Sequence, residues 1–266
     1  MIASRVHAIM AAGLENPELL ARWKQQPELL RTYGVDPATF DLDALWKFAG
    51  LSAKVKHNGL RSELPLTFRF LSLNGQEIEV FSAYASHKAG TRFAPTTEER
   101  IIELVNFLDD WLDFKKPEHS MLWDLIRHES ALAQLQKLTP ATRKSRDRKV
   151  PVTASVPRVV GRIILHEMSC DPRLVGKLVR ENSFNLDKVQ PGSVHLCYWN
   201  PGDPDEICIL ELDELGYHLL SLVDGKTSVA AFNRLFGGKS RMPKNLINAF
   251  TELASVGVIS FSKTAA

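Results

Sequence analysis

The fold of this 266-residue chain is decided by the stretch ILELDELGYHLLSLVDGKTSVAAFNRLF, residues 209–236, with LINAFTELASVGVISF, residues 246–261, behind it. Just before and at the start of this stretch, two short apolar segments predict strands over 194–199 and 207–212, joined by a turn rich in Asn, Pro, Gly and Asp. The apolar residues that follow recur at helical spacing. They predict helices over 213–223, 227–236 and 243–256, and a closing strand over 258–261.

The first of these helices is expected to bury one face, and each helix is expected to begin or end at a residue suited to that position. The buried face consists of Leu212, Leu215, Leu219 and Leu222. The end residues are Gly225 after the first helix, Thr227 or Ser228 before the second, Pro243 in the first turn of the third and Gly257 after it.

The order of a strand, an acidic helix start, an L-x-D-G turn ending at Gly225, two short helices and the motif L-x-x-x-G-V-I ending at Ile259 resembles a known domain. It is similar to the PqqD-like winged helix, the recognition element that binds the leader of a ribosomally made peptide during its modification. The resemblance implies that the leader adds as an antiparallel strand to 207–212, beside helix 243–256. The peptide-binding residues it implies are Ile207, Cys208, Ile209, Leu210, Glu211, Leu212, Leu246, Ile247 and Phe250.

A strand at the edge of a sheet offers unpaired N–H and C=O groups to such a peptide. Period-two alternation places Cys208, Leu210 and Leu212 on one face of the strand, with Ile207 and Ile209 on the other. Some of these side chains must also build the core of a small domain, so we expect two or three of them to contact the peptide. Proline at position 209 removes a backbone donor, so we expect this change to weaken peptide binding.

Residues 1–138 are predicted to be almost entirely helical. The strongest prediction is a helix over 97–115, because Thr96 and Glu99 have the spacing of a capping box and apolar residues follow at helical period. Further helices are expected over 41–50, 64–85 and 119–138, and two short copies of a Pro-Glu-Leu-Leu pattern begin at Pro17 and Pro27.

A polar, basic segment bounded by prolines, residues 139–153, is predicted to link two domains. The expected fold class is therefore α+β, with an all-helical domain over 1–138 that docks a partner. The second domain, over 154–266, is expected to be a winged helix with a small antiparallel sheet and three helices. A strand over 159–165 and a helix over 172–181 complete it.

The helical half shows a second resemblance. The segment MLWDLIRHESALAQL, residues 121–135, fits the helix pattern W-x-D-L-x-R-x-E-x-A-L, and residues 16–61 are similar to the N-terminal region of the same proteins. These are the TglI-like partner subunits, which act beside TIM-barrel, multi-iron oxygenases that modify peptides; MbnC-like subunits have an analogous role. The resemblance implies a heterodimer with a TglH-like enzyme of a 3-thiaglutamate-type pathway, which oxidises a C-terminal cysteine. The iron would belong to the partner, and this chain would carry no cofactor and no catalytic residue.

The sequence contains none of the familiar catalytic or metal-binding motifs. His166 and Cys170 are expected to be packed side chains, and His128 with Glu129 to lie on a helix surface. Cys197 and Cys208 lie on strands that we expect to pair, and we interpret them as small apolar residues of one sheet face. A redox pair is the alternative.

The formal net charge is +2, so no broad electrostatic field points to nucleic acid or to an anionic membrane. The sequence has no apolar run long enough to cross a bilayer, no signal-peptide core and no cysteine framework, so we expect a cytoplasmic protein. The basic run in 139–153 is interpreted as a solvated linker, with contact to an acidic partner as the alternative. The competing interpretation of the whole chain is a winged-helix regulator that binds nucleic acid.

Overall fold

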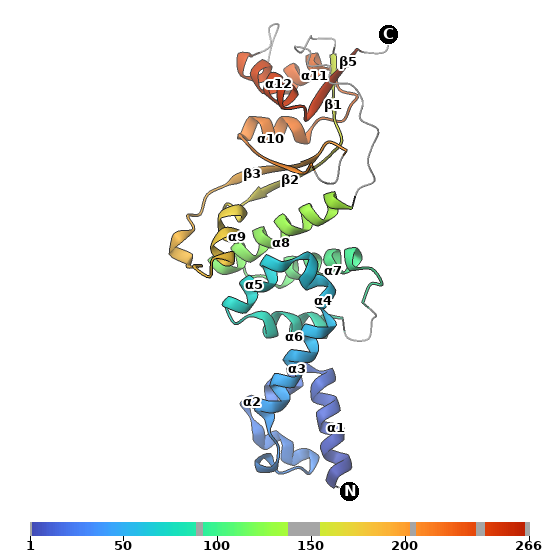
Figure 1. Ribbon diagram of the computed structural model, residues 1–266, viewed down its shortest axis with the longest axis vertical. Coiled ribbons are helices and arrows are strands. Elements are labelled where there is room, and N and C mark those ends of the chain that lie inside the picture. The colour runs from blue at the N-terminus through green and yellow to red at the C-terminus, as the bar shows by residue number, and fades with distance from the viewer. Residues whose placement is uncertain (1, 89–92, 138–154, 203–205, 238–242, 264–266) are drawn as a thin grey trace. The chain divides into compact units, whose positions relative to one another are not determined.

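The computed structural model of the protein describes residues 2–88, 93–137, 155–202, 206–237 and 243–263. Within them the fold is α+β, as predicted, with a helical N-terminal region and small antiparallel sheets (Figure 1). The chain forms two compact units: unit 1 comprises Met1–Ile126 and Gly176–Phe184, and unit 2 comprises Arg127–Val175 and Asn185–Ala266. The predicted linker, 139–153, lies outside the described residues.

Unit 1 is built from helices. Its elements are α1 (Ile2–Glu15), α2 (Pro17–Gln25), the 3-10 helices η1 (Pro27–Tyr33) and η2 (Pro37–Thr39), α3 (Leu42–Lys56), α4 (Asn58–Glu63), α5 (Pro65–Leu73), α6 (Glu77–His87), α7 (Thr97–Trp111), the first part of α8 (Pro117–Gln136) and the last part of α9 (Pro172–Arg180).

Local signals fix several of these ends. The capping box predicted before α7 is present, since the Thr96 hydroxyl accepts from the Glu99 N–H at 3.2 Å and the Glu99 carboxylate accepts from the Thr96 N–H. The expected helix over 64–85 is two helices, because the chain turns at Gly75, whose φ is 68°. The second Pro-Glu-Leu-Leu copy forms the 3-10 helix η1, whereas the first copy begins α2.

Unit 2 contains a three-stranded antiparallel sheet in the order β2-β3-β4, formed by β2 (Arg162–Met168), β3 (Val194–Asn200) and β4 (Cys208–Leu212). The register pairs Cys197 with Leu210 and Trp199 with Cys208. The 3-10 helix η3 (Leu186–Lys188) precedes β3, and the helices that follow β4 are α10 (Glu214–Ser221), α11 (Val229–Leu235) and α12 (Lys244–Val256).

Both faces of this sheet are covered. One face, with Leu210 and Leu212, packs on the core of the three helices, which buries Leu219, Phe232, Leu246, Phe250 and their neighbours. The other face, with Ile207 and Ile209, packs around Tyr198 against Ala131 and Leu135 of α8. Figure 1 shows α10 and α8 on opposite sides of the strands. The alternation predicted from the sequence is therefore the one that the strand adopts.

A second, two-stranded sheet joins β1 (Ser155–Val159) to β5 (Ile259–Lys263), which is the predicted closing strand. The strand expected over 159–165 is present from Arg162 as β2, but it does not include 159–161, because the chain turns between β1 and β2 at Gly161, whose φ is 76°. A side chain there would meet the backbone carbonyl of Asn200. Only glycine permits this turn without a shift of the neighbouring strand.

The two units divide the chain differently from the predicted boundary at 138. The second half of α8 belongs to unit 2 because Ala131 and Leu135 pack on the sheet and the Leu135 carbonyl accepts from the Asn200 amide at 2.9 Å. Residues 176–184 belong to unit 1, where Phe184 packs on Phe70 with ring centroids 4.9 Å apart.

The ends of the helices that follow β4 also differ in part from those predicted. Helix α10 ends at Ser221, so Leu222 is 48% exposed and the buried residue is Leu220. Gly225 has a positive φ of 72°, but it lies in the loop before α11 rather than at the helix end. Pro243 is the N-cap of α12, and Gly257 ends that helix in the left-handed conformation, as predicted.

Within the described part of the chain, no helix combines the length and apolar character needed to cross a membrane.

Candidate functional site

Strand β4 lies at one edge of the three-stranded sheet, with β3 on one side. Among the described residues, no backbone hydrogen bond joins its other side to another element. The strand runs directly into α10 through Asp213, whose carboxylate caps the helix by accepting from the Gly216 N–H at 2.7 Å. Because the cap fixes the turn, the open edge of β4 is held in a defined position beside the helices.

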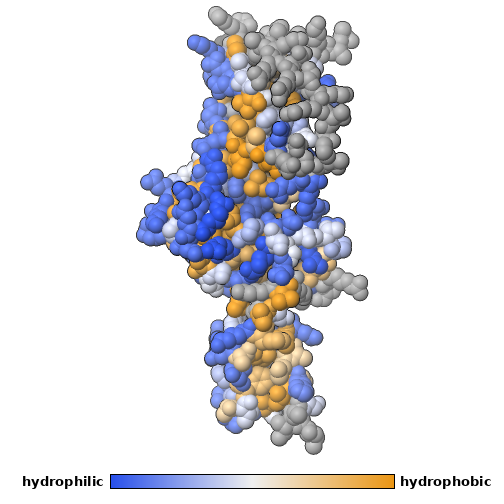
Figure 2. Space-filling model, in the orientation of Figure 1, coloured by the Kyte–Doolittle hydropathy of each residue, from blue (hydrophilic) through white to orange (hydrophobic). Residues whose placement is uncertain are grey.

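A groove lies between this end of β4 and α12, with a volume of about 290 Å³. Its apolar lining comes from both elements, and its polar lining consists of carboxylates. The lining residues are Leu210, Glu211, Leu212, Asp213, Gly216, Ala249, Glu252, Leu253 and Val256. Figure 2 shows apolar side chains gathered on the viewed face of unit 2 at the level of α10 and the strands.

The structure brings part of the predicted site together. Leu210, Glu211 and Leu212 line the groove. Ile207 and Ile209 instead pack against the cluster on the opposite face of the sheet. Cys208 is exposed, opposite Trp199 of β3.

On α12 the predicted face is the buried one. Leu246 and Phe250 are 1% and 0% exposed and form the core, and neither they nor Ile247 line the groove. The groove is lined by the adjacent stripe, Ala249, Glu252, Leu253 and Val256. The signal for this stripe is Val256, an apolar residue outside the helix's core spacing, which is 51% exposed.

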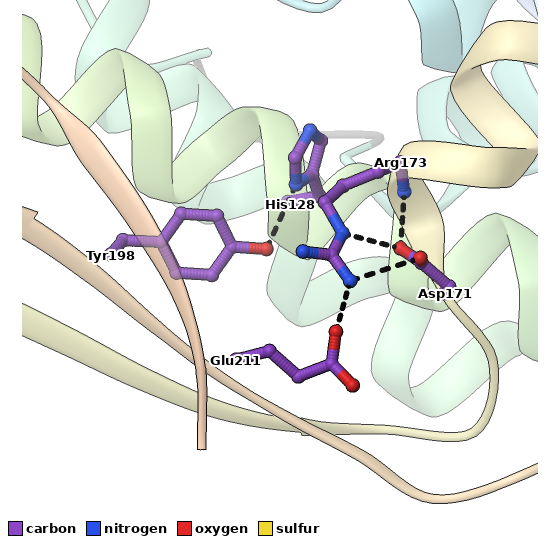
Figure 3. A network of polar contacts seen from close by, with 5 residues as sticks. All are labelled: His128, Asp171, Arg173, Tyr198 and Glu211. Carbon is purple, nitrogen blue, oxygen red and sulfur yellow. Dashed lines mark hydrogen bonds and ion pairs between the residues drawn. The ribbon is translucent and has the colours of Figure 1, made fainter.

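An ion-pair network ties β4 to α9 on the other face of the sheet. The Arg173 guanidinium donates to both oxygens of Asp171, at 2.8 and 3.0 Å, and to Glu211 at 2.5 Å. Figure 3 shows the Arg173 guanidinium between the carboxylates of Asp171 and Glu211. Burial raises the pKa of Asp171, but the hydrogen bonds from Arg173 outweigh this effect and hold the pKa below its usual value. The network therefore fixes Glu211 at the strand edge.

The nearby pair His128 and Tyr198 is buried, with 2.8 Å between the imidazole Nδ1 and the phenol oxygen (Figure 3). His128 and Glu129 are 6% and 5% exposed, so their expected place on a helix surface is wrong. The reason is that this half of α8 covers the sheet. Burial lowers the pKa of the neighbouring His166 to about 4, and the charges of Arg127 and His128 lower it further.

The cysteines differ in exposure. Cys170 and Cys197 are buried, as expected for small apolar residues, and burial raises the pKa of the Cys197 thiol to about 12. Cys208 is exposed, so the same expectation is wrong for it. The register offsets Cys208 from Cys197 by two residues.

Unit 1 carries an exposed apolar stripe on α3. Phe48, Leu51 and Val55 are 56%, 58% and 65% exposed, and their spacing places them on one side of the helix. We refer to these three residues as the α3 stripe. Of four tryptophans in unit 1, Trp23 is buried, and Trp46, Trp111 and Trp123 are half-buried.

In the ranges that the structure describes, no group of three or more His, Cys, Asp and Glu side chains is arranged to hold a metal ion.

No protein-family model matches the chain, and no curated protein matches its sequence.

Proposed function

We propose that this chain is a non-catalytic docking subunit that binds the leader of a ribosomally made precursor peptide. In this role it presents the peptide's C-terminal cysteine to an iron-dependent TIM-barrel oxygenase of the TglH-like type, in a 3-thiaglutamate-type pathway. The two proteins would form a heterodimer. The iron and the oxidation chemistry would belong to the partner, as the resemblance to TglI-like and MbnC-like subunits implies.

The observation that carries this proposal is the groove between the open edge of β4 and α12. An extended peptide can add to such an edge, with main-chain hydrogen bonds supplying affinity and side-chain pockets supplying selectivity. The groove volume of about 290 Å³ is at the lower limit for small-molecule sites, which favours a few peptide side chains over a cofactor.

Docking alone accelerates a reaction by tethering. A leader held on β4 keeps the modified end of the same peptide near the partner's iron site, which raises its effective concentration without new contacts at the reacting atoms. The chain therefore needs a peptide site and a partner surface, but no catalytic residue.

The α3 stripe supports the second requirement. Exposed apolar side chains that line up on one helix are typical of a protein–protein interface rather than of a solvated surface. We assign the α3 stripe to the contact with the partner enzyme, on unit 1, whereas the peptide groove is on unit 2.

Co-purification tests the proposal. The chain is expressed with the proteins encoded beside its gene, captured, analysed for iron and titrated with the neighbouring precursor peptide. We expect a stoichiometric iron-containing partner and peptide binding with a Kd of about 1 µM or tighter. A chain that is captured alone, ignores the peptide and shifts duplex DNA in a salt-dependent way contradicts the proposal and favours the nucleic-acid-binding regulator.

The described surface of α12 gives that regulator little support. The exposed residues of the helix include one cation, Lys244, and one carboxylate, Glu252. A recognition helix usually offers several cations to phosphates, whereas α12 offers one; its exposed amides, Asn245 and Asn248, are the part of this surface that suits base edges.

Cys208 allows the docking position to be tested directly. It is the exposed thiol of the three and lies on β4, whereas Cys170 and Cys197 are buried. A peptide that adds along β4 should slow alkylation of Cys208 by a maleimide, measured by mass spectrometry. Unchanged alkylation at saturating peptide would place the peptide elsewhere.

A further inference from the structure

The groove between β4 and α12 has an apolar floor and a rim of carboxylates. Leu210, Leu212, Ala249, Leu253 and Val256 supply the apolar surface. The charged lining residues are Glu211, Asp213 and Glu252, and the lining contains no Lys or Arg.

Two of the three carboxylates are not neutralised by a neighbour. Glu211 pairs with Arg173 at 2.5 Å. In the part of the chain that the structure describes, neither Asp213 nor Glu252 forms an ion pair, and the Asp213 carboxylate accepts a hydrogen bond from the Gly216 N–H. An occupant that covers the groove would bring these two charges closer to apolar surface and strengthen their interaction with any charge that it carries.

We infer that the peptide segment bound in this groove carries a Lys or Arg side chain and two apolar side chains at alternate positions. The inference rests on the proposed function and specifies its ligand. In a peptide strand added to β4, alternate side chains point to the same face of the sheet. Those on the face of Leu210 and Leu212 enter the groove, where the apolar pair contacts the floor and the cation contacts Asp213 and Glu252.

The intervening peptide side chains face the other side of the sheet, beside Glu211 and Arg173. There the carboxylate is already paired, so this side selects less strongly for charge. The expected recognition pattern is therefore a basic residue, any residue, an apolar residue, any residue and an apolar residue, in either chain direction.

The test is an affinity selection of short random peptides on the full chain, followed by measurement of the Kd of the enriched peptides. Binding along β4 is verified by protection of Cys208 from alkylation. We expect enriched peptides to alternate apolar residues and to carry Lys or Arg at the same alternate positions.

Variants of the chain test the charges without changing shape. Asp213→Asn keeps a side-chain oxygen for the helix cap, and Glu252→Gln keeps the length of the side chain. In the double variant we expect the Kd of an enriched peptide to rise about threefold to tenfold at low salt, and its salt dependence to weaken. Glu214→Gln is the matched control, since this side chain is 80% exposed, stands next to Asp213 and does not line the groove.

The outcomes separate the inference from the proposed function. Enriched peptides that protect Cys208 but show no preference for Lys or Arg, or that bind the double variant as tightly as the wild type, overturn the inference and leave peptide docking intact. A selection in which no peptide is enriched overturns both.

Discussion

At the scale of single residues, the backbone conformation and its close neighbours restrict position 161 to glycine. Gly161 has a φ of 76°, and a Cβ atom there would overlap the backbone of Asn200 and Pro201. We expect Gly161→Ala to lower the free energy of unfolding by about 2 to 4 kcal/mol, because it combines left-handed strain with a steric overlap that involves backbone. Thermal or urea unfolding measures the loss.

Gly192→Ala is the control for this substitution. Gly192 has no positive φ, and no atom lies within 4 Å of the position of its Cβ. A change there should stay within about 0.5 kcal/mol. Equal losses at both positions would mean that the tight β1–β2 turn is not the cause.

His166 should make stability depend on pH. Burial lowers its pKa to about 4 from an ordinary value of 6.5. Between pH 6.5 and 4, the His166 side chain is therefore protonated in the unfolded chain and neutral in the folded protein. Stability is therefore lost as the pH falls from 6.5 toward 4, by at most about 3 kcal/mol. Urea unfolding at several pH values should show this loss in the wild type and a reduced loss in His166→Leu.

The exposed His218, whose side chain is 57% exposed, provides the control. His218→Leu should retain the wild-type dependence between pH 6.5 and 4. If His166→Leu and the wild type lose stability in parallel, His166 takes up its proton as readily in the folded protein as in the unfolded chain, which contradicts the prediction.

At the scale of elements, the groove stripe of α12 can be separated from general surface effects. Val256 and Leu235 are the last residues of α12 and α11, and they are 51% and 68% exposed, but Val256 alone lines the groove. We expect Val256→Gln to weaken peptide binding about threefold to tenfold by removing apolar contact, and Leu235→Gln to leave it unchanged. Fluorescence anisotropy with a labelled peptide measures both, and equal weakening would argue against the groove.

The α3 stripe gives a parallel prediction for the partner. Phe48→Ser with Leu51→Ser should weaken capture of the iron enzyme about tenfold or more, because truncated interface anchors dominate binding energies. Peptide affinity should not change. Ile102→Ser on α7 is matched in exposure, at 51%, and should leave capture intact. A pull-down with quantified partner distinguishes these cases.

Elements whose signals are local were predictable from the sequence. Three such elements depend on residues close together in the chain. They are the capping box of Thr96 and Glu99, the left-handed helix end at Gly257, and the strands β3 and β4 joined by a turn. The sequence offers both Thr227 and Ser228 as the cap of α11. The structure resolves this choice, because Thr227 bonds to Asp224 and Ser228 caps α11.

Long-range relations were not predictable in this way. The pairing of β1 with β5 joins Ser155 to Lys263, and nothing near either residue encodes that register. The resemblance implies Leu246, Ile247 and Phe250 as the peptide-binding residues of α12, but neither a motif nor helical spacing says what covers an apolar helix face in the folded chain. The shape of the groove, which needs the whole fold, places Ala249, Leu253 and Val256 along it instead.

At the scale of the whole molecule, the path of the chain runs from unit 1 to unit 2, returns to unit 1 over 176–184, and ends in unit 2. Unit 1 needs 176–184, where the Arg69 guanidinium donates to the Val179 carbonyl at 3.0 Å and to Asn182 at 2.7 Å. Unit 2 needs the second half of α8, which covers Tyr198 and Leu196. Each unit is therefore completed by a segment that lies beyond the linker predicted at 139–153.

We expect the fragments 1–137 and 155–266 to be poorly soluble when expressed separately, because each exposes an apolar surface that the other fragment normally covers. Co-expression should restore a soluble complex, detected by size-exclusion chromatography. Two fragments that fold cooperatively on their own would show that the predicted division at the linker describes independent domains after all.

Because residues 176–184 belong to unit 1, this unit cannot be completed during protein synthesis until they have been made. Arg69 lies 110 residues before its partner Val179, so at ordinary elongation rates the ribosome needs about 5 to 20 s to deliver that partner. During this interval the nascent helices expose the surface around Phe70 that Phe184 later covers. We therefore expect the first half of the protein to bind chaperones until the second half has emerged, and a truncated message to yield a chain that is degraded.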